Sequence, residues 1–156
     1  MTGPMTTVAD GFHFLEAPRW HDGRLWFSDF YGYNVRSMRE DGSDVREEAT
    51  VPGQPSGLGW LPDGRLLVVS MRDRKVLRRE PDGSLSVHGD LGSHATGHTN
   101  DMVVDEQGRA YVGNFGFDLM AGDPLEPAAL HRVDPDGQVH KVADDVWFPN
   151  GRLSLV

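Results

Sequence analysis

The feature of this sequence that most constrains its fold is a hairpin pattern that recurs along the chain. From Gly97 to Asn114 the sequence reads GHTNDMVVDEQGRAYVGN, in which two short apolar runs flank a Gly-containing turn. Two β-rich runs joined by such a turn are typical of a β-hairpin. The same layout occurs in LEAPRWHDGRLWFSD from Leu15 and in PSGLGWLPDGRLLVVS from Pro55, and another copy begins as PNGRLSLV at Pro149. The chain is therefore built from repeats.

The spacing of the copies indicates a propeller. The residues that end the first run of each copy are 40, 44 and 50 positions apart, namely Trp20, Trp60, Val104 and Ser154. Strand-turn-strand units that recur at about 40–45 residues are typical of propeller blades. Apolar residues come in short runs without the 3.6-residue spacing of a helix, so we expect an all-β chain of four-stranded blades.

The repeats also set the expected boundaries. Residues 1–11 are expected to form a lead-in with a short strand at Thr7–Ala9, and residues 12–156 a partial propeller. Its blades would cover roughly residues 12–52, 53–92 and 97–145, and the next blade would begin at 149–156. An extra loop, Phe115–Pro127, lengthens the third blade. Propellers close with about four to eight blades, so we expect an open arc truncated to about half of a six-bladed ring.

Composition excludes several classes of function. The chain is 38% apolar and 25% charged, which is typical of a folded globular protein, and it has no cysteine for disulfides, thiol catalysis or thiolate metal sites. A net charge of −9 argues against nucleic acid as a partner, because phosphate binding needs a basic surface. No apolar run reaches the roughly 18 residues of a membrane span, and the N-terminus lacks the pattern of a signal peptide. We therefore expect a cytoplasmic protein with no membrane partner.

Four polar residues occupy one position of the repeat, four residues before the end of each first run: Glu16, Ser56, Asn100 and Asn150. The innermost strand of each propeller blade lines the central channel, so we expect these side chains to converge, with Asp101 beside them. Carboxylate and amide oxygens are the ligands that hard cations such as Ca²⁺ and Mg²⁺ prefer. Zn²⁺ or Mn²⁺ could replace them.

Each of these residues also has a structural interpretation when it is considered alone. Asn150 with the following glycine could form a turn, and Glu16 could be an exposed strand end. Asn100 and Asp101 could cap a turn through bonds from side chain to backbone. Ser56 could serve packing or support the other residues. The recurrence at one blade position favours a shared site over four separate structural roles.

The motifs EAPRW…GRLWFSD, PSGLGWLPDGRLLV, TNDMVVDEQGRAYVGN and FPNG together resemble the senescence marker protein/gluconolactonase/luciferin-regenerating enzyme family, from about Phe12 to the C-terminus. The resemblance implies a six-bladed β-propeller that holds one divalent cation in its central channel and hydrolyses lactones. It implies that Glu16 and Asn150 bind the metal and that Asn100 contacts the substrate. We expect the adjacent Asp101 to be the catalytic carboxylate.

Two departures from the family pattern affect these expectations. His98 stands where the family often has arginine, and we expect it, with Ser56, to contact the substrate. The family's metal-binding aspartate would lie one blade beyond Asn150. Because Glu16 would then be the only carboxylate ligand, we expect the site to be incomplete in this chain, which would be either inactive alone or completed by a second polypeptide.

The sequence therefore predicts a metal-dependent hydrolase of a small-molecule lactone. The cation, Ca²⁺ before Zn²⁺, Mn²⁺ or Mg²⁺, would polarise the lactone carbonyl and activate water, and a carboxylate would take the proton. Two alternatives stay open. The chain could be a propeller-type scaffold that binds a ligand without turnover, or a truncated gene product with no function of its own.

Overall fold

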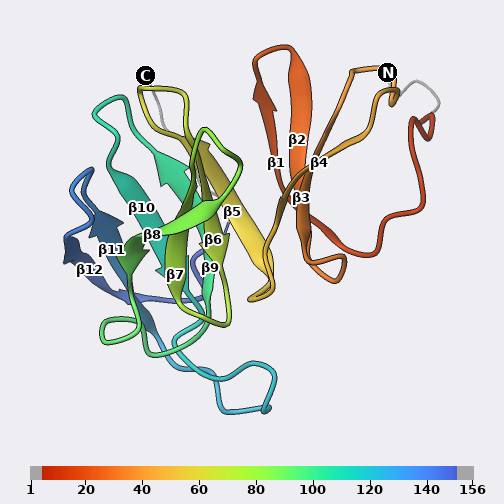
Figure 1. Cartoon of the computed structure of the whole chain (residues 1–156). Coiled ribbons are helices and arrows are strands. Elements are labelled where there is room, and N and C mark those ends of the chain that lie inside the picture. The colour runs from red at the N-terminus through yellow and green to blue at the C-terminus, as the bar shows by residue number, and fades with distance from the viewer. Residues whose placement is uncertain (1–4, 151–156) are drawn as a thin grey trace.

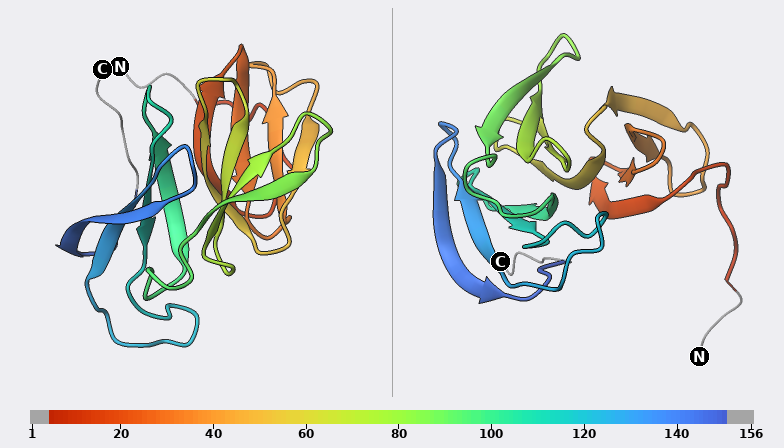
Figure 2. Two further views of the ribbon diagram at one scale, coloured as in Figure 1. Left: turned by 60° about the vertical axis from the view of Figure 1, so that its left-hand side comes forward. Right: turned by 90° about the horizontal axis from the view of Figure 1, so that it is seen from below.

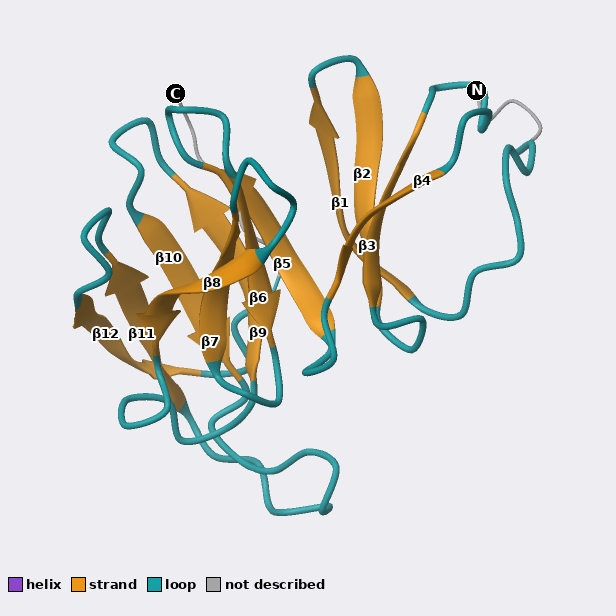
Figure 3. Cartoon of the chain, in the orientation of Figure 1, coloured by secondary structure: helices purple, strands orange, loops and turns teal. Residues whose placement is uncertain are grey.

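The computed structural model describes residues 5–150, which form twelve β-strands and no helix (Figure 3). The first sheet contains, in spatial order, β1 Leu15–His21, β2 Arg24–Asp29, β3 Asn34–Met38 and β4 Arg46–Thr50. The second contains β5 Pro55–Trp60, β6 Leu66–Ser70, β7 Lys75–Arg79 and β8 Leu85–Asp90. The third contains β9 Thr99–Val104, β10 Ala110–Asn114, β11 Ala128–Val133 and β12 Val139–Val146. In the described part of the chain no segment is a helix able to cross a membrane.

The three sheets are the blades of an open arc. Neighbouring strands are antiparallel throughout the first sheet, as they are in the other two. Seen from below, the sheets fan around a common inner side on which β1, β5 and β9 lie (Figure 2). The sheets do not close into a ring. The prediction of an all-β, propeller-like chain with three four-stranded blades is confirmed.

The lead-in differs from the expectation. Residues 5–14 contain no strand, so the one predicted at Thr7–Ala9 is not formed. Side-chain packing holds this segment instead, because Phe12 meets Phe27 of β2 edge-on with ring centroids 5.1 Å apart. The Phe30 amide also donates a hydrogen bond of 2.8 Å to the Phe14 carbonyl. At the other end, most of the blade start predicted at 149–156 lies outside the described residues.

Two apolar cores join the blades, and β6 contributes to both. Leu66 and Val68 are buried between the first and second sheets, whereas Leu67 and Val69 are buried between the second and third. Successive side chains of a strand point to opposite faces, so a central blade needs an uninterrupted apolar run. The sequence LLVVS of β6 meets this demand, and all of its residues are buried.

A bulge recurs in each inner hairpin, close to the polar residue that the repeats align. The register shifts between Glu16 and Arg19 in the first blade and between Pro55 and Leu58 in the second. In the third blade the shift falls between Val112 and Asn114, opposite the start of β9. A bulge bends the strand and re-aims its side chains. The first residues of the inner strands remain paired, but in a register that is shifted from that of the rest of the strand.

Candidate functional site

The predicted site residues lie where the inner strands begin. Strands β1, β5 and β9 start at the same end of the arc, and the long loop 115–127 extends at that end (bottom of Figure 1). The strands approach each other closely there. A methyl group added at Gly57 of β5 would lie 2.4 Å from the Met102 backbone nitrogen of β9. Only glycine permits this approach of two backbones.

Three of the four aligned side chains meet. The Ser56 hydroxyl lies 2.8 Å from Glu16 Oε2 and 3.0 Å from Asn100 Oδ1. Ser56 and Asn100 are 1% and 2% exposed, so bulk solvent does not reach them. A serine hydroxyl carries one hydrogen, so it donates to one of the two oxygens at a time. We call Glu16, Ser56 and Asn100 the inner-strand cluster.

A second buried serine, Ser28, contacts the cluster from strand β2. The Ser28 hydroxyl of β2 donates a hydrogen bond of 2.6 Å to the Ser56 carbonyl, and both residues are buried. This bond links the second strand of one blade to the first strand of the next. Ser56 is therefore held through its backbone as well as its side chain.

Asp101 is paired with an arginine that the sequence analysis did not single out. Arg19 Nη2 of β1 donates to Asp101 Oδ1 at 2.9 Å and to the Met102 carbonyl, also at 2.9 Å. The Met102 amide donates to the same Asp101 oxygen at 2.8 Å. The Asp101 side chain is 9% exposed and that of Arg19 is 24% exposed. This ion pair connects the first blade directly to the third.

His98 and Asn150 lie outside the cluster's hydrogen bonds. The His98 carbonyl accepts a hydrogen bond of 3.0 Å from the Phe115 amide, and its Nδ1 is buried with no partner among the described residues. Asn150 is exposed and is the last residue described. Phe148 stacks on Phe115 with ring centroids 4.8 Å apart. Within residues 5–150 no hydrogen bond joins Asn150 to the cluster, so its role as a metal ligand stays a prediction.

The donor set suits a hard cation only in part. Among the described residues, no group of three or more His, Asp or Glu side chains is placed to hold a metal ion. The cluster offers oxygen donors, which Ca²⁺ prefers, but Ca²⁺ takes six to eight of them. Glu16 is its single carboxylate, and its Oε2 is engaged with Ser56. The described residues therefore supply part of a metal shell at most.

Another buried carboxylate, Asp29, has a structural role. Its oxygens accept hydrogen bonds from the amides of His13, Phe14 and Gly32, and from the His13 ring at 3.3 Å. Burial by itself raises the pKa of Asp29, but these donors outweigh burial and hold the pKa below its usual value. Asp29 thus ties the lead-in and the β2–β3 loop to the first sheet.

The sequence of this chain matches the model of a known protein family. The SMP-30/gluconolactonase/LRE-like region matches residues 14–153. The chain belongs to this family. The resemblance seen in the sequence is thereby confirmed, and it covers all three blades. No curated protein sequence matches the chain closely enough to add a further relative.

Solved structures of this family have the same fold. A gluconolactonase from Xanthomonas campestris is 25% identical with a TM-score of 0.73, covering 88% of this chain and 50% of that one. A calcium-binding regucalcin from Agrobacterium tumefaciens is 20% identical with a TM-score of 0.67, covering 86% of this chain and 44% of that one. A luciferin-regenerating enzyme is 18% identical with a TM-score of 0.69, covering 87% and 47%. The chain spans about half the length of these structures.

Proposed function

We propose that this protein hydrolyses a small-molecule lactone at the inner-strand cluster. The observation that carries the proposal is the convergence of Glu16, Ser56 and Asn100 at 2.8 and 3.0 Å. Membership of the family and the likeness to a gluconolactonase at 25% identity support the choice of reaction. The cluster lies at the beginnings of the inner strands, where side chains of all three blades can reach one substrate.

The proposal includes one divalent cation, Ca²⁺ first and Zn²⁺, Mn²⁺ or Mg²⁺ as substitutes. When bound, such an ion polarises a carbonyl and lowers the pKa of water. Glu16 would hold it, with Asn150 as a further predicted ligand. One carboxylate compensates a divalent charge poorly. We therefore include an acidic ligand from beyond the described residues or from a second chain.

The remaining polar groups would orient the lactone and move the proton. His98 and Asn100 would bind the ring oxygens of the substrate. Asp101 would accept a proton from the attacking water through Oδ2, because Arg19 and the Met102 amide both engage Oδ1. The Arg19 guanidinium would compensate the Asp101 charge and keep the carboxylate in place.

A pH-stat assay of lactone hydrolysis tests this function. We expect acid release from glucono-δ-lactone or δ-valerolactone with Ca²⁺ present, its loss on addition of EDTA, and its recovery with excess Ca²⁺. The spontaneous rate without protein is the baseline. A rate that EDTA leaves unchanged would contradict the metal requirement, and a baseline rate with every cation would contradict the hydrolase.

The ion pair of Asp101 with Arg19 favours a second candidate, a scaffold that binds a ligand without turnover. In this candidate the contacts of Asp101 with Arg19 and the Met102 amide hold the wall of a binding site in place. This candidate predicts that a lactone raises the melting temperature in the presence of EDTA and that no acid is released. The pH-stat assay separates the two candidates directly.

A further inference from the structure

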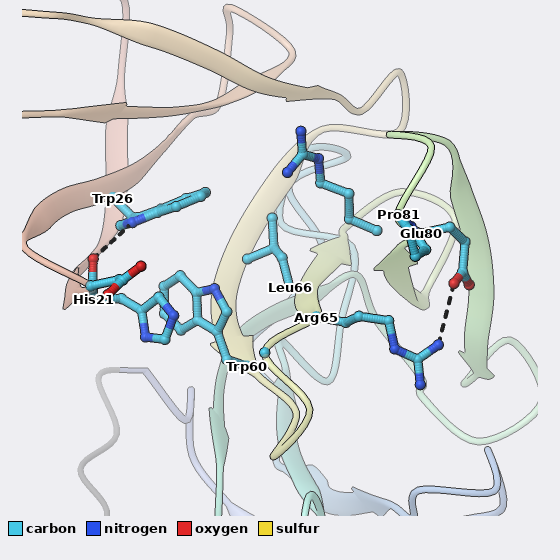
Figure 4. A pocket seen from close by; sticks show the side chains of 10 residues that line it. His21, Trp26, Trp60, Arg65, Leu66, Glu80 and Pro81 are labelled. Atoms are coloured by element: carbon cyan, nitrogen blue, oxygen red, sulfur yellow. Dashed lines mark hydrogen bonds and ion pairs between the residues drawn. The ribbon is translucent and has the colours of Figure 1, made fainter.

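A pocket opens between the first and second sheets, far from the inner-strand cluster. It has a volume of about 270 Å³ and lies beside the β1–β2 and β5–β6 turns (Figure 4). Strand β1 begins next to Glu16 and ends at His21, which lines the pocket. The pocket is thus at the opposite end of the inner strands from the cluster, and the proposed hydrolysis does not use it.

Aromatic rings form one wall of the pocket. The His21 ring stacks on Trp60 with centroids 3.9 Å apart and planes 10° apart. Trp26 meets Trp60 edge-on at 5.4 Å and 80°, and its indole nitrogen donates to the His21 carbonyl at 3.1 Å. Leu66, which is 3% exposed, adds an aliphatic surface. Rings held in fixed orientations favour a planar partner.

One cation in the pocket lacks a close partner. Arg65 lies 2.7 Å from Asp63 and 3.2 Å from Glu80, so two carboxylates compensate its charge. The ion pair of Arg79 is longer, with 3.8 Å between its Nη1 and Glu48, and the Arg79 side chain is 36% exposed, so its guanidinium can be reached from the pocket. A guanidinium binds a carboxylate through two parallel hydrogen bonds. Arg79 can therefore receive an anionic group.

The corresponding end of the next blade interface is filled. A methyl group added at Gly108 would lie 3.0 Å from Pro62, 3.4 Å from Leu61 and 3.5 Å from Pro135. The chain's own side chains thus occupy the space between the turns of the second and third blades. The pocket between the first and second blades is therefore specific to that interface and, among the described residues, does not recur between the second and third blades.

We propose that this pocket binds a small planar carboxylate, with its ring against Trp26 and Trp60 and its carboxylate on Arg79. The volume suits a single-ring acid and is below the range of pockets that hold larger ligands. The aromatic side chains stabilise the bound ring. The Arg79 guanidinium, whose charge is only partly compensated by Glu48, favours an anionic ligand over a neutral one. This site is separate from the lactone site and does not depend on the proposed function.

Two-dimensional NMR of the indole N–H groups tests the site, with benzoate as the probe. We expect saturable shifts for Trp26 and Trp60, whereas the signals of Trp20 and Trp147, which are 59% and 62% exposed, stay in place. Neutral benzamide has the same shape and should bind about tenfold more weakly, since it loses a charge-assisted bond. The variant Arg79→Gln should weaken benzoate binding by a similar factor.

A matched control is Arg72→Gln, because Arg72 is exposed in the β6–β7 loop at the other end of the blade. It should bind benzoate as the wild type does. Equal affinity for benzoate and benzamide in the wild-type protein would overturn the proposal, even if Arg79→Gln fails to fold. Shifts of all four indoles alike, or of none, would overturn it as well. The lactone assay is unaffected by any of these outcomes.

Discussion

The carboxylate of Glu16 and the hydroxyl of Ser56 meet at 2.8 Å although 40 positions separate them in the chain. Each is the second residue of an inner strand, in successive blades. Asn100 is the second residue of the third inner strand and lies 3.0 Å from the same hydroxyl. The repeat therefore brings three chemically different side chains to one point, and the proposed function rests on that point.

Replacing the central serine should destabilise the protein. In Ser56→Ala, the Glu16 carboxylate and the buried Asn100 amide lose their common partner, and we expect the free energy of unfolding to fall by about 1 kcal/mol. Urea unfolding measures the change. Ser93→Ala is the control, because Ser93 is exposed. Equal stability of the two variants would show that the hydroxyl makes no net contribution.

Replacing Arg19 should lower the free energy of unfolding more than replacing a surface arginine. The Asp101 side chain is 9% exposed, so Arg19→Ala leaves a largely buried carboxylate without its cation, at a cost of about 1–3 kcal/mol. Arg46→Ala breaks a pair with Asp44 in which Arg46 is 54% exposed, and should lower the free energy of unfolding much less, because solvent screens an exposed pair. Adding Asp101→Asn to Arg19→Ala should restore part of the loss. The prediction fails if the two single variants are equally stable.

Two glycines of β5 should respond differently to alanine. At Gly57 the added methyl would meet the Met102 backbone nitrogen at 2.4 Å, whereas at Gly59 it would meet a Val104 methyl group at 2.4 Å. A side chain can rotate away but a paired backbone cannot. We expect Gly57→Ala to lower the free energy of unfolding by about 1–3 kcal/mol and Gly59→Ala to lower it less. Thermal unfolding compares them, and the reverse order would contradict the packing of β5 on β9.

Asp29 should make the fold sensitive to acid. Its pKa is lowered in the folded chain, because the N–H donors outweigh the opposing effect of burial. The carboxylate therefore stabilises the fold fully above pH about 4, and this contribution is lost as the pH falls through the folded pKa. Asp29→Asn should be less stable at neutral pH and lose less stability on acidification. Parallel pH profiles for Asp29→Asn and the wild type would refute this, and Asp123→Asn, at an exposed position, is the control.

Much of the fold could be predicted because the repeat is explicit in the sequence. The expected gap between the second and third strands of the last blade, Phe115–Pro127, agrees closely with the observed interval between β10 and β11. The lead-in could not be predicted in this way. Thr7–Ala9 has strand-forming residues, but pairing depends on a free neighbouring edge, and the packing of Phe12 on Phe27 holds the segment in another conformation.

The convergence of the aligned side chains could be predicted from the sequence, but the ion pair beside them could not. Alignment of the repeats pointed to Glu16, Ser56 and Asn100, which the structure brings together. Arg19 was missed because it lies three positions after Glu16, which would place the two on opposite faces of a regular strand. The bulge between them breaks that alternation. The available signal was Asp101 itself, since a carboxylate on a buried strand needs a compensating cation.

The most direct test of the central claim compares the kcat/KM for lactone hydrolysis of two asparagine variants in the presence of Ca²⁺. Asn100 and Asn34 are 2% and 6% exposed, but Asn34 lies on β3, outside the cluster. We predict that Asn100→Ala lowers kcat/KM by about 100-fold or more, whereas Asn34→Ala, once shown to be folded, retains the wild-type value. Wild-type kcat/KM in Asn100→Ala would contradict hydrolysis at the inner-strand cluster.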